Sequence, residues 1–196
     1  MNPESLHAQL AAIRGYDQYP TSGIKQDLLQ SFFPTNMTEM VNDLSNVTSA
    51  FYGFLLKHVG ETLGPEHING VSEKLFYSLG QLKTQQALQK HDSLFTDTTA
   101  FAIVPISAIY NASPEYIFSV DKLTADHTTL TMTGVDRYYR ICHQLGIAEH
   151  LTWPTLLPFM EAIKDTLQLD VTISYELQPF TENYETHCVY HFQKHS

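Results

Sequence analysis

The spacing of apolar residues changes at Ser113-Pro114, and this change limits the possible folds more than any other feature. From residue 36 up to this point, apolar side chains recur every three or four positions, which is the period of an α-helix. After it they alternate one by one, which is the period of a β-strand with one buried face. The sequence therefore predicts helices before Pro114, apart from loops, and every strand after it.

The helical part divides into three segments. Residues 36–63 carry an apolar stripe over about seven turns, and Gly64-Pro65 ends it. A second stripe from Ile68 to Leu82 follows after only a few residues, so the pair is expected to form an antiparallel hairpin. Residues 99–110 are predicted as a buried helix with a kink at Pro105.

Two strands, two helices and two more strands are predicted in the second half. The expected ranges are strands at 116–120 and 128–133, a helix from Gly134 to Gly146, a helix capped by Thr152 or Thr155, and strands at 169–177 and 186–193. The predicted fold class is α+β, with N-terminal helices followed by a ββααββ unit whose antiparallel sheet is covered by helices. Residues 1–35 are interpreted as an N-terminal arm of short helices, and residues 36–196 as a single α+β ligand-binding domain.

Charge and cysteine content exclude several classes of partner. Among 196 residues, 21 Asp and Glu outnumber 11 Lys and Arg, for a formal net charge of −10. Nucleic acid and anionic lipid would repel such a surface, so neither is an expected partner. No secretory leader or membrane-spanning run occurs in the first thirty residues, and we expect a cytoplasmic protein in which Cys142 and Cys188 stay reduced.

The ten histidines do not predict a metal site. His187, His191 and His195 are the densest group, but they fall on or beside a predicted strand. Residues four apart on a strand are separated by about 13 Å, too far to share a zinc ion bound at about 2 Å. Two histidines and two glutamates within residues 58–67 are a weaker candidate, because such residues at helix ends usually act as caps. We expect neither a metal nor a cofactor.

Aromatic residues of the second half are the strongest candidates for ligand contacts. They lie on or near the predicted sheet and the helices at 135–145 and 155–168, where phenol hydroxyls could orient an apolar or heteroaromatic ligand. The candidate ligand-binding residues are Tyr138, Tyr139, Trp153, Phe159, Tyr175 and Tyr190.

Four segments of the chain resemble a known family in order and spacing. They read HVGETLGPEHINGVSEKLFYSLGQ, SPEYIFSVDKLTADHTTLTMTGVDRYYRICHQLGI, LQLDVTISYELQ and HCVYHF. Together they resemble the L-2-amino-thiazoline-4-carboxylic acid hydrolase-like proteins and, more distantly, the 4-vinyl-reductase-type small-molecule-binding domains. The resemblance implies a compact ligand-binding domain and, for the named enzyme, hydrolytic opening of a small sulfur heterocycle.

Two positions matter for the activity that this resemblance implies. Members of the family tend to carry one cysteine at the strand-to-helix junction and another in the final strand; here the junction position is Asp136, and the final strand keeps Cys188. With half of the thiols missing, the leading hypothesis is a sensor or carrier that binds a small organic ligand. The alternatives are a hydrolase of a small cyclic amidine or amide, with Cys188 or Asp136 as the catalytic group, and an interaction module that forms a homodimer through its long N-terminal helices.

Overall fold

The computed structural model describes residues 6–13, 31–91, 96–110 and 113–195. It confirms the α+β fold class: within these ranges, the helices before Pro114 are followed by a four-stranded antiparallel sheet interrupted by two helices. The chain divides into two compact units, Met1–Leu44 and Ser45–Ser196, which are described separately.

The first unit holds helix α1 (Leu6–Ile13) and the beginning of helix α3 (Met37–Leu63). One of the short helices predicted for residues 1–35 is thus present, whereas residues 14–30 of the predicted arm lie outside the described residues. Side-chain caps explain why α3 begins where it does. The Asn36 Oδ1 atom accepts a hydrogen bond from the Glu39 amide at 3.0 Å, and the Glu39 carboxylate accepts one from the Thr35 amide at 2.7 Å.

Two long helices form the predicted antiparallel hairpin. Helix α3 ends at Gly64, whose φ of 111° is a conformation that favours glycine, and a short 3₁₀ turn (η1, Pro65–His67) leads into helix α4 (Ile68–Lys90). The hydroxyls of Tyr52 and Ser72 lie 2.8 Å apart across the pair. Helix α4 runs eight residues beyond the predicted apolar stripe, and helix α5 (Ala100–Ile109) contains Pro105 within its span.

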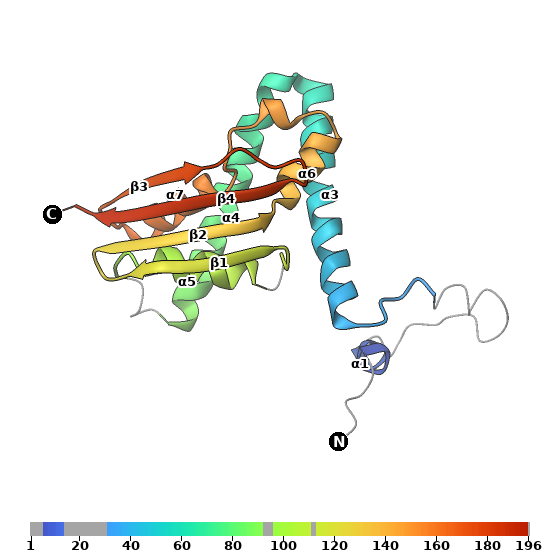
Figure 1. Cartoon of the computed structure of the whole chain (residues 1–196), viewed down its shortest axis with the longest axis horizontal. Helices are drawn as coiled ribbons and strands as arrows, with labels where there is room; N and C mark the ends of the chain where they lie inside the picture. The colour runs from blue at the N-terminus through green and yellow to red at the C-terminus, as the bar shows by residue number, and fades with distance from the viewer. Residues whose placement is uncertain (1–5, 14–30, 92–95, 111–112, 196) are drawn as a thin grey trace. The chain divides into compact units, whose positions relative to one another are not determined.

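The sheet is built from strands β1 (Tyr116–Leu123), β2 (His127–Val135), β4 (Glu185–Lys194) and β3 (Val171–Leu177), in that spatial order. Helices α4, α5 and α7 (Leu157–Leu167) lie behind it in Figure 1 and cover one face. Met132 of β2 lies opposite Phe118 of β1 and Cys188 of β4, so the inward side chains of three strands form rows across the sheet.

The predicted start of the helix after β2 is wrong by three residues. Gly134 belongs to β2 with a φ of 104°, and a Cβ atom there would overlap the carbonyl oxygen of Glu115, so the close approach of β1 requires glycine. Helix α6 (Arg137–Gln144) starts after an Asp136 cap instead. The cap predicted for α7 at Thr152 or Thr155 is also not found, because a 3₁₀ turn (η3, Ala148–His150) and an extended loop precede a helix whose N-cap is Leu156.

None of the helices in the described ranges combines the length and the hydropathy needed to span a bilayer.

Candidate functional site

A small internal cavity lies where the sheet meets the N-terminus of α6 and the loop before α7. Its walls come from β1, β2, β4, the α6 cap and the loop. The lining residues are Tyr116, Met132, Asp136, Pro154, Thr155, Leu156, Thr186, Cys188 and Tyr190. The free volume is about 10 Å³, which is room for about one water molecule. In this conformation the cavity is therefore closed to an organic ligand.

Asp136 brings a carboxylate to the wall of this cavity. It is 7% exposed and caps α6, where its Oδ1 atom accepts hydrogen bonds from the Tyr138 and Tyr139 amides at 2.9 Å each. Burial raises the pKa of this carboxyl above its usual value, and these backbone bonds act in the opposite direction. The site thus holds a buried acid whose proton affinity depends on what fills the cavity beside it.

Tyr116 brings its hydroxyl close to the Asp136 carboxyl. Its side chain on β1 is 7% exposed, and its hydroxyl makes no hydrogen bond of good geometry, although its interaction with Asp136 lowers the pKa of that carboxyl. Leaving a buried hydroxyl poorly paired costs up to about 1–3 kcal/mol relative to a well-made hydrogen bond. Tyr116 therefore has hydrogen-bonding capacity that a bound polar atom could use.

Cys188 faces the cavity from β4, beside Tyr190. It is 2% exposed, and burial raises the pKa of its thiol to about 11, although the neighbouring Tyr190 side chain lowers it somewhat. The lining residues include no Lys, Arg or His that could stabilise a thiolate. At neutral pH the thiol is protonated, which suits a packing group better than a nucleophile.

Tyr139 and Trp153 meet in an aromatic cluster that is separate from the cavity lining. The Tyr139 ring stacks on Phe180, with centroids 3.7 Å apart and planes at 6°, and Trp153 lies edge-on to both rings at 5.1 and 5.4 Å. Phe180 comes from the loop between β3 and β4. Because Trp153 directly precedes Pro154, this cluster anchors the residue before the loop that closes the cavity.

The other predicted ligand contacts are distributed over the domain. Tyr138 packs edge-on against Tyr52 and Phe76, with ring centroids 4.9 and 5.1 Å away. Phe159 is buried on α7 at 1% exposure, and Tyr175 of β3 is 37% exposed, with its hydroxyl 3.5 Å from the Trp153 carbonyl oxygen. Of the six aromatic residues predicted to contact a ligand, Tyr190 is the one that lines the cavity, together with both predicted catalytic residues, Asp136 and Cys188.

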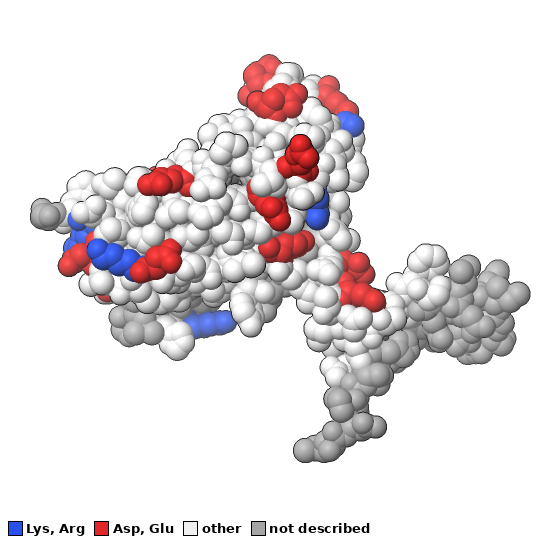
Figure 2. All heavy atoms as spheres, viewed as in Figure 1, with Lys and Arg blue, Asp and Glu red and all other residues white. Residues whose placement is uncertain are grey.

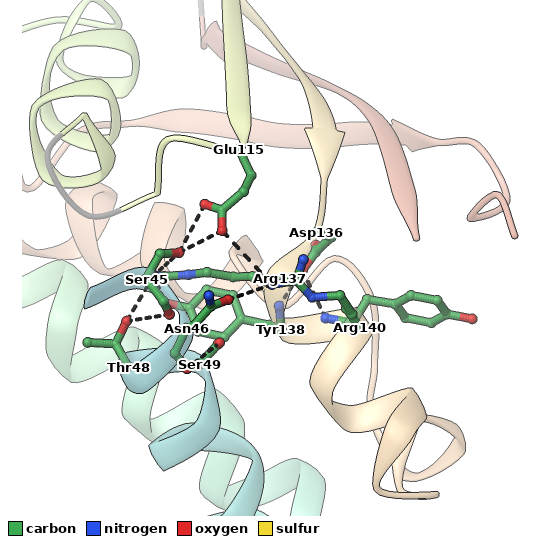
Figure 3. Close-up of polar contacts among 10 residues, drawn as sticks. Ser45, Asn46, Thr48, Ser49, Glu115, Asp136, Arg137, Tyr138 and Arg140 are labelled. Atoms are coloured by element: carbon green, nitrogen blue, oxygen red, sulfur yellow. Dashed lines mark hydrogen bonds and ion pairs between the residues drawn. The ribbon is translucent and has the colours of Figure 1, made fainter. Parts of the chain in front are cut away.

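A buried arginine holds the start of α6 against α3 (Figure 3). Arg137 is 4% exposed, and its Nη1 atom donates to the hydroxyls of Ser45 and Thr48 at 2.9 Å each, while Nη2 donates to the Tyr138 hydroxyl at 2.6 Å. The Glu115 carboxylate accepts the Ser45 hydroxyl at 2.8 Å. Bonds to a charged group are among the stronger ones in proteins, so this network positions the neighbouring Asp136.

The walls that surround Asp136 and Cys188 were not predicted from the sequence. The inner face of the sheet carries Tyr116, Met132 and Thr186 together with Cys188. Met132 lies opposite Cys188 in the register of β2 and β4, and Gly134 lies opposite both Tyr116 and Thr186. The alternation of the strands contained this signal, because it orients these side chains. The loop residues Pro154–Leu156 had no such signal.

The tail histidines do not converge on the site. His187 and His191 lie on the partly exposed outer face of β4, and the His191 ring packs edge-on near His127 at 6.2 Å. In the described ranges, no group of three or more His, Cys, Asp or Glu residues is arranged to hold a metal ion.

Comparisons with known proteins give resemblances of low identity. No protein-family model matches the chain, and no curated protein matches it. Among solved structures, the phenol-responsive sensory domain of the transcription activator PoxR with phenol is similar at 14% identity and a TM-score of 0.49, over 74% of each chain. An Fe(II) unliganded H-NOX protein mutant from K. algicida is similar at 15% identity and a TM-score of 0.33, over 70% of this chain and 74% of that one.

Proposed function

We propose that this protein binds a small organic molecule at the cavity between the sheet and helices α6 and α7, and that it acts as a sensor or carrier. The observation that carries the proposal is the pair of a buried Tyr116 hydroxyl and the Asp136 carboxyl at the cavity wall, in which the hydroxyl makes no hydrogen bond of good geometry. Buried polar atoms in native proteins are usually paired, and a missing partner is often a ligand or a water. A bound polar group would complete the hydrogen bonds of this site.

The lining defines the chemistry of the ligand. Tyr116 can donate or accept a hydrogen bond, Asp136 can accept one from an N–H or O–H, and Met132, Pro154 and Leu156 supply apolar contacts. A compact, neutral molecule with one polar edge fits these groups, such as a phenol or a nitrogen heterocycle. Because the free volume holds about one water, such a ligand requires the loop residues Pro154–Leu156 to move outward.

Burial and the lack of a cation in the lining favour binding over hydrolysis. A catalytic Cys188 would need a thiolate, and its pKa of about 11 keeps the thiol protonated at neutral pH. Asp136 already accepts two backbone hydrogen bonds as a helix cap, which gives it a structural role that does not depend on catalysis.

The test is ligand binding followed through the single tryptophan. Trp153 adjoins the loop that must move, so its fluorescence is expected to change when phenols or nitrogen heterocycles are titrated in. Tyr116→Phe removes only the hydroxyl and should weaken binding roughly tenfold, while the stability of the free protein changes by no more than about 1 kcal/mol. The matched control is Tyr77→Phe, which removes the hydroxyl that donates to Asp165 on the surface at 2.7 Å.

Two results would contradict the proposal. One is the absence of any fluorescence or thermal response across the panel, with nothing copurifying in native mass spectrometry. The other is equal affinity of the wild type, Tyr116→Phe and Tyr77→Phe for a ligand that does bind.

A further inference from the structure

Helix α3 presents large apolar side chains on the side opposite to its own domain. Within Ser45–Leu63, the buried positions are mostly small or polar: Ser45, Ser49, Tyr52, Gly53 and Leu56. The outer positions are larger and apolar, and their exposed fractions are 53% for Val47, 74% for Phe51, 49% for Phe54 and 49% for Leu55. Burial within the domain therefore does not explain why this face is apolar.

The spacing of the outer residues indicates that another helix packs against this face of α3. Val47, Phe51 and Phe54 follow each other by four and three positions, and the next step of four reaches His58. This is the heptad spacing of positions a and d in a coiled coil, in which the seam of one helix packs against the seam of another. In the sequence of α3 the same spacing continues toward the N-terminus at Leu44, Met40 and Met37.

We propose that this face is the interface of a homodimer in which α3 packs antiparallel against α3 of a second copy. The seam is self-complementary in this orientation, because Phe51 at an a position faces the partner's Phe54 at a d position, and the same pair recurs across the two-fold axis. Val47 then faces the partner's His58 at each end. Four phenylalanine rings meet at the centre, where aromatic residues contribute most to binding.

Charge favours a second copy over a membrane as the occupant. Residues 47–56 contain no charged side chain, so two copies can approach along this stretch despite the net charge of −10. Amphipathic helices that lie on membranes carry Lys and Arg along their polar face. Here Glu61 and Glu66 lie exposed where α3 ends, and acidic residues outnumber basic ones over the face shown in Figure 2.

The exposed apolar area is that of a small interface, which suits a weak dimer. A Phe ring buries about 150–250 Å² when fully covered, so Phe51 and Phe54 together can remove on the order of 200 Å² from water in each copy. Leu55, Val47 and the stems of flanking residues add to this buried area, which stays in the range of transient complexes. We therefore expect a dissociation constant on the order of 10 µM.

Sedimentation equilibrium of the full chain tests the interface. The wild type should reach twice the monomer mass of 22.3 kDa at about 100 µM, well above the expected dissociation constant. Phe51→Glu places like charges at the centre and should raise the dissociation constant by at least about 30-fold, the effect of losing a hot-spot side chain. The matched control is Leu82→Glu on α4, which is 49% exposed and lies off the seam, and which should leave the dimer unchanged.

Cysteine cross-linking tests the orientation. Cys142 and Cys188 are 0% and 2% exposed, so they should not compete with introduced thiols. The double variant Val47→Cys, His58→Cys should oxidise to a covalent dimer, whereas Val47→Cys alone should not. A far-ultraviolet circular dichroism spectrum like that of the wild type establishes that each variant is folded.

Each other outcome overturns the proposal. A wild-type monomer at 100 µM would mean that the N-terminal residues of the same chain or a different protein cover this face. A dimer that Phe51→Glu does not weaken, or that Leu82→Glu weakens equally, would place the interface elsewhere. Cross-linking of Val47→Cys alone would mean parallel helices, and binding of the monomer to anionic vesicles through Phe51 would make the face a lipid contact.

Discussion

Gly80 lies where α4 and α7 approach each other most closely, and its replacement by alanine tests the packing behind the cavity. A Cβ atom at this position would lie 2.6 Å from the Phe159 carbonyl oxygen, 2.8 Å from the Ala162 Cβ and 3.0 Å from the Phe159 Cα. Ordinary van der Waals contact begins at about 3.5 Å. Since two of these atoms belong to the α7 backbone, the helices must separate by several tenths of an ångström.

The expected change in stability is the difference of two effects. Overpacking of this kind costs about 1–3 kcal/mol, whereas alanine in place of glycine within a helix gains about 0.5–1 kcal/mol. Gly80→Ala should therefore lower the free energy of unfolding by about 1–2 kcal/mol. For a chain of this length, the melting temperature should fall by roughly 2–8 °C.

Gly70→Ala is the matched control because it makes the same change in the same helix. A Cβ atom at Gly70 would have no heavy atom within 4 Å, so only the gain in helix propensity remains. This variant should be equal to the wild type or up to about 1 kcal/mol more stable. Urea unfolding followed by circular dichroism at 222 nm measures both changes. If Gly80→Ala proves as stable as Gly70→Ala, α4 and α7 do not pack as closely at Gly80 as in this structure.

Three further predictions concern the thiols and Asp136. Burial raises the pKa values of Cys188 and Cys142 to about 11 and about 12. Iodoacetamide at pH 8 should therefore label both thiols at least on the order of 100-fold more slowly in the folded protein than in urea, as measured by the mass of the intact protein. Rapid labelling of Cys188 alone would favour the hydrolase hypothesis. At position 136, Asn retains the cap and Ala loses it, so Asp136→Ala should unfold about 1–2 kcal/mol more easily than Asp136→Asn. Burial also raises the pKa of Asp136 in the folded protein above its value near 3.8 in the unfolded chain. The Asp136 side chain therefore contributes most to stability below pH 3.8, and this contribution falls as the pH rises through the raised pKa. The stability of Asp136→Asn relative to the wild type, measured by urea titration, should therefore increase from pH 4 to pH 7. If the difference in free energy of unfolding between the two proteins does not change with pH, Asp136 is not desolvated.

The secondary structure was largely predictable because each element has a regular apolar period. The strand at 171–177 and its partner at 185–194 follow from alternation alone, and the two long helices follow from steps of three and four. The start of α6 was not predictable in this way. Gly134 has its φ of 104° because β1 passes close beside it, and a contact between strands leaves no periodic signal.

The direction of a site side chain was predictable only where a strand determined it. Cys188 and Tyr190 face inward by alternation, whereas Asp136 was expected only from the family resemblance, and its role as the cap of α6 was not foreseen because the helix was predicted to begin at Gly134. Tyr139 and Trp153 were expected to line a pocket, but Phe180 stacks on Tyr139, and Phe180 lies in an irregular loop whose path depends on tertiary packing. Aromatic content indicated which part of the chain holds the site but not which rings line it.

The spatial order of the strands determines when the cavity can form during folding. β1–β2 and β3–β4 are hairpins of neighbouring segments, which close quickly. The chain between β2 and β4 is much longer, because it contains α6, α7 and β3. The walls that hold Tyr116 and Cys188 come from different hairpins, so the cavity exists only after the two hairpins have docked. A ligand that requires both walls would bind the native state and not a single hairpin, and its whole binding free energy would then add to the free energy of unfolding.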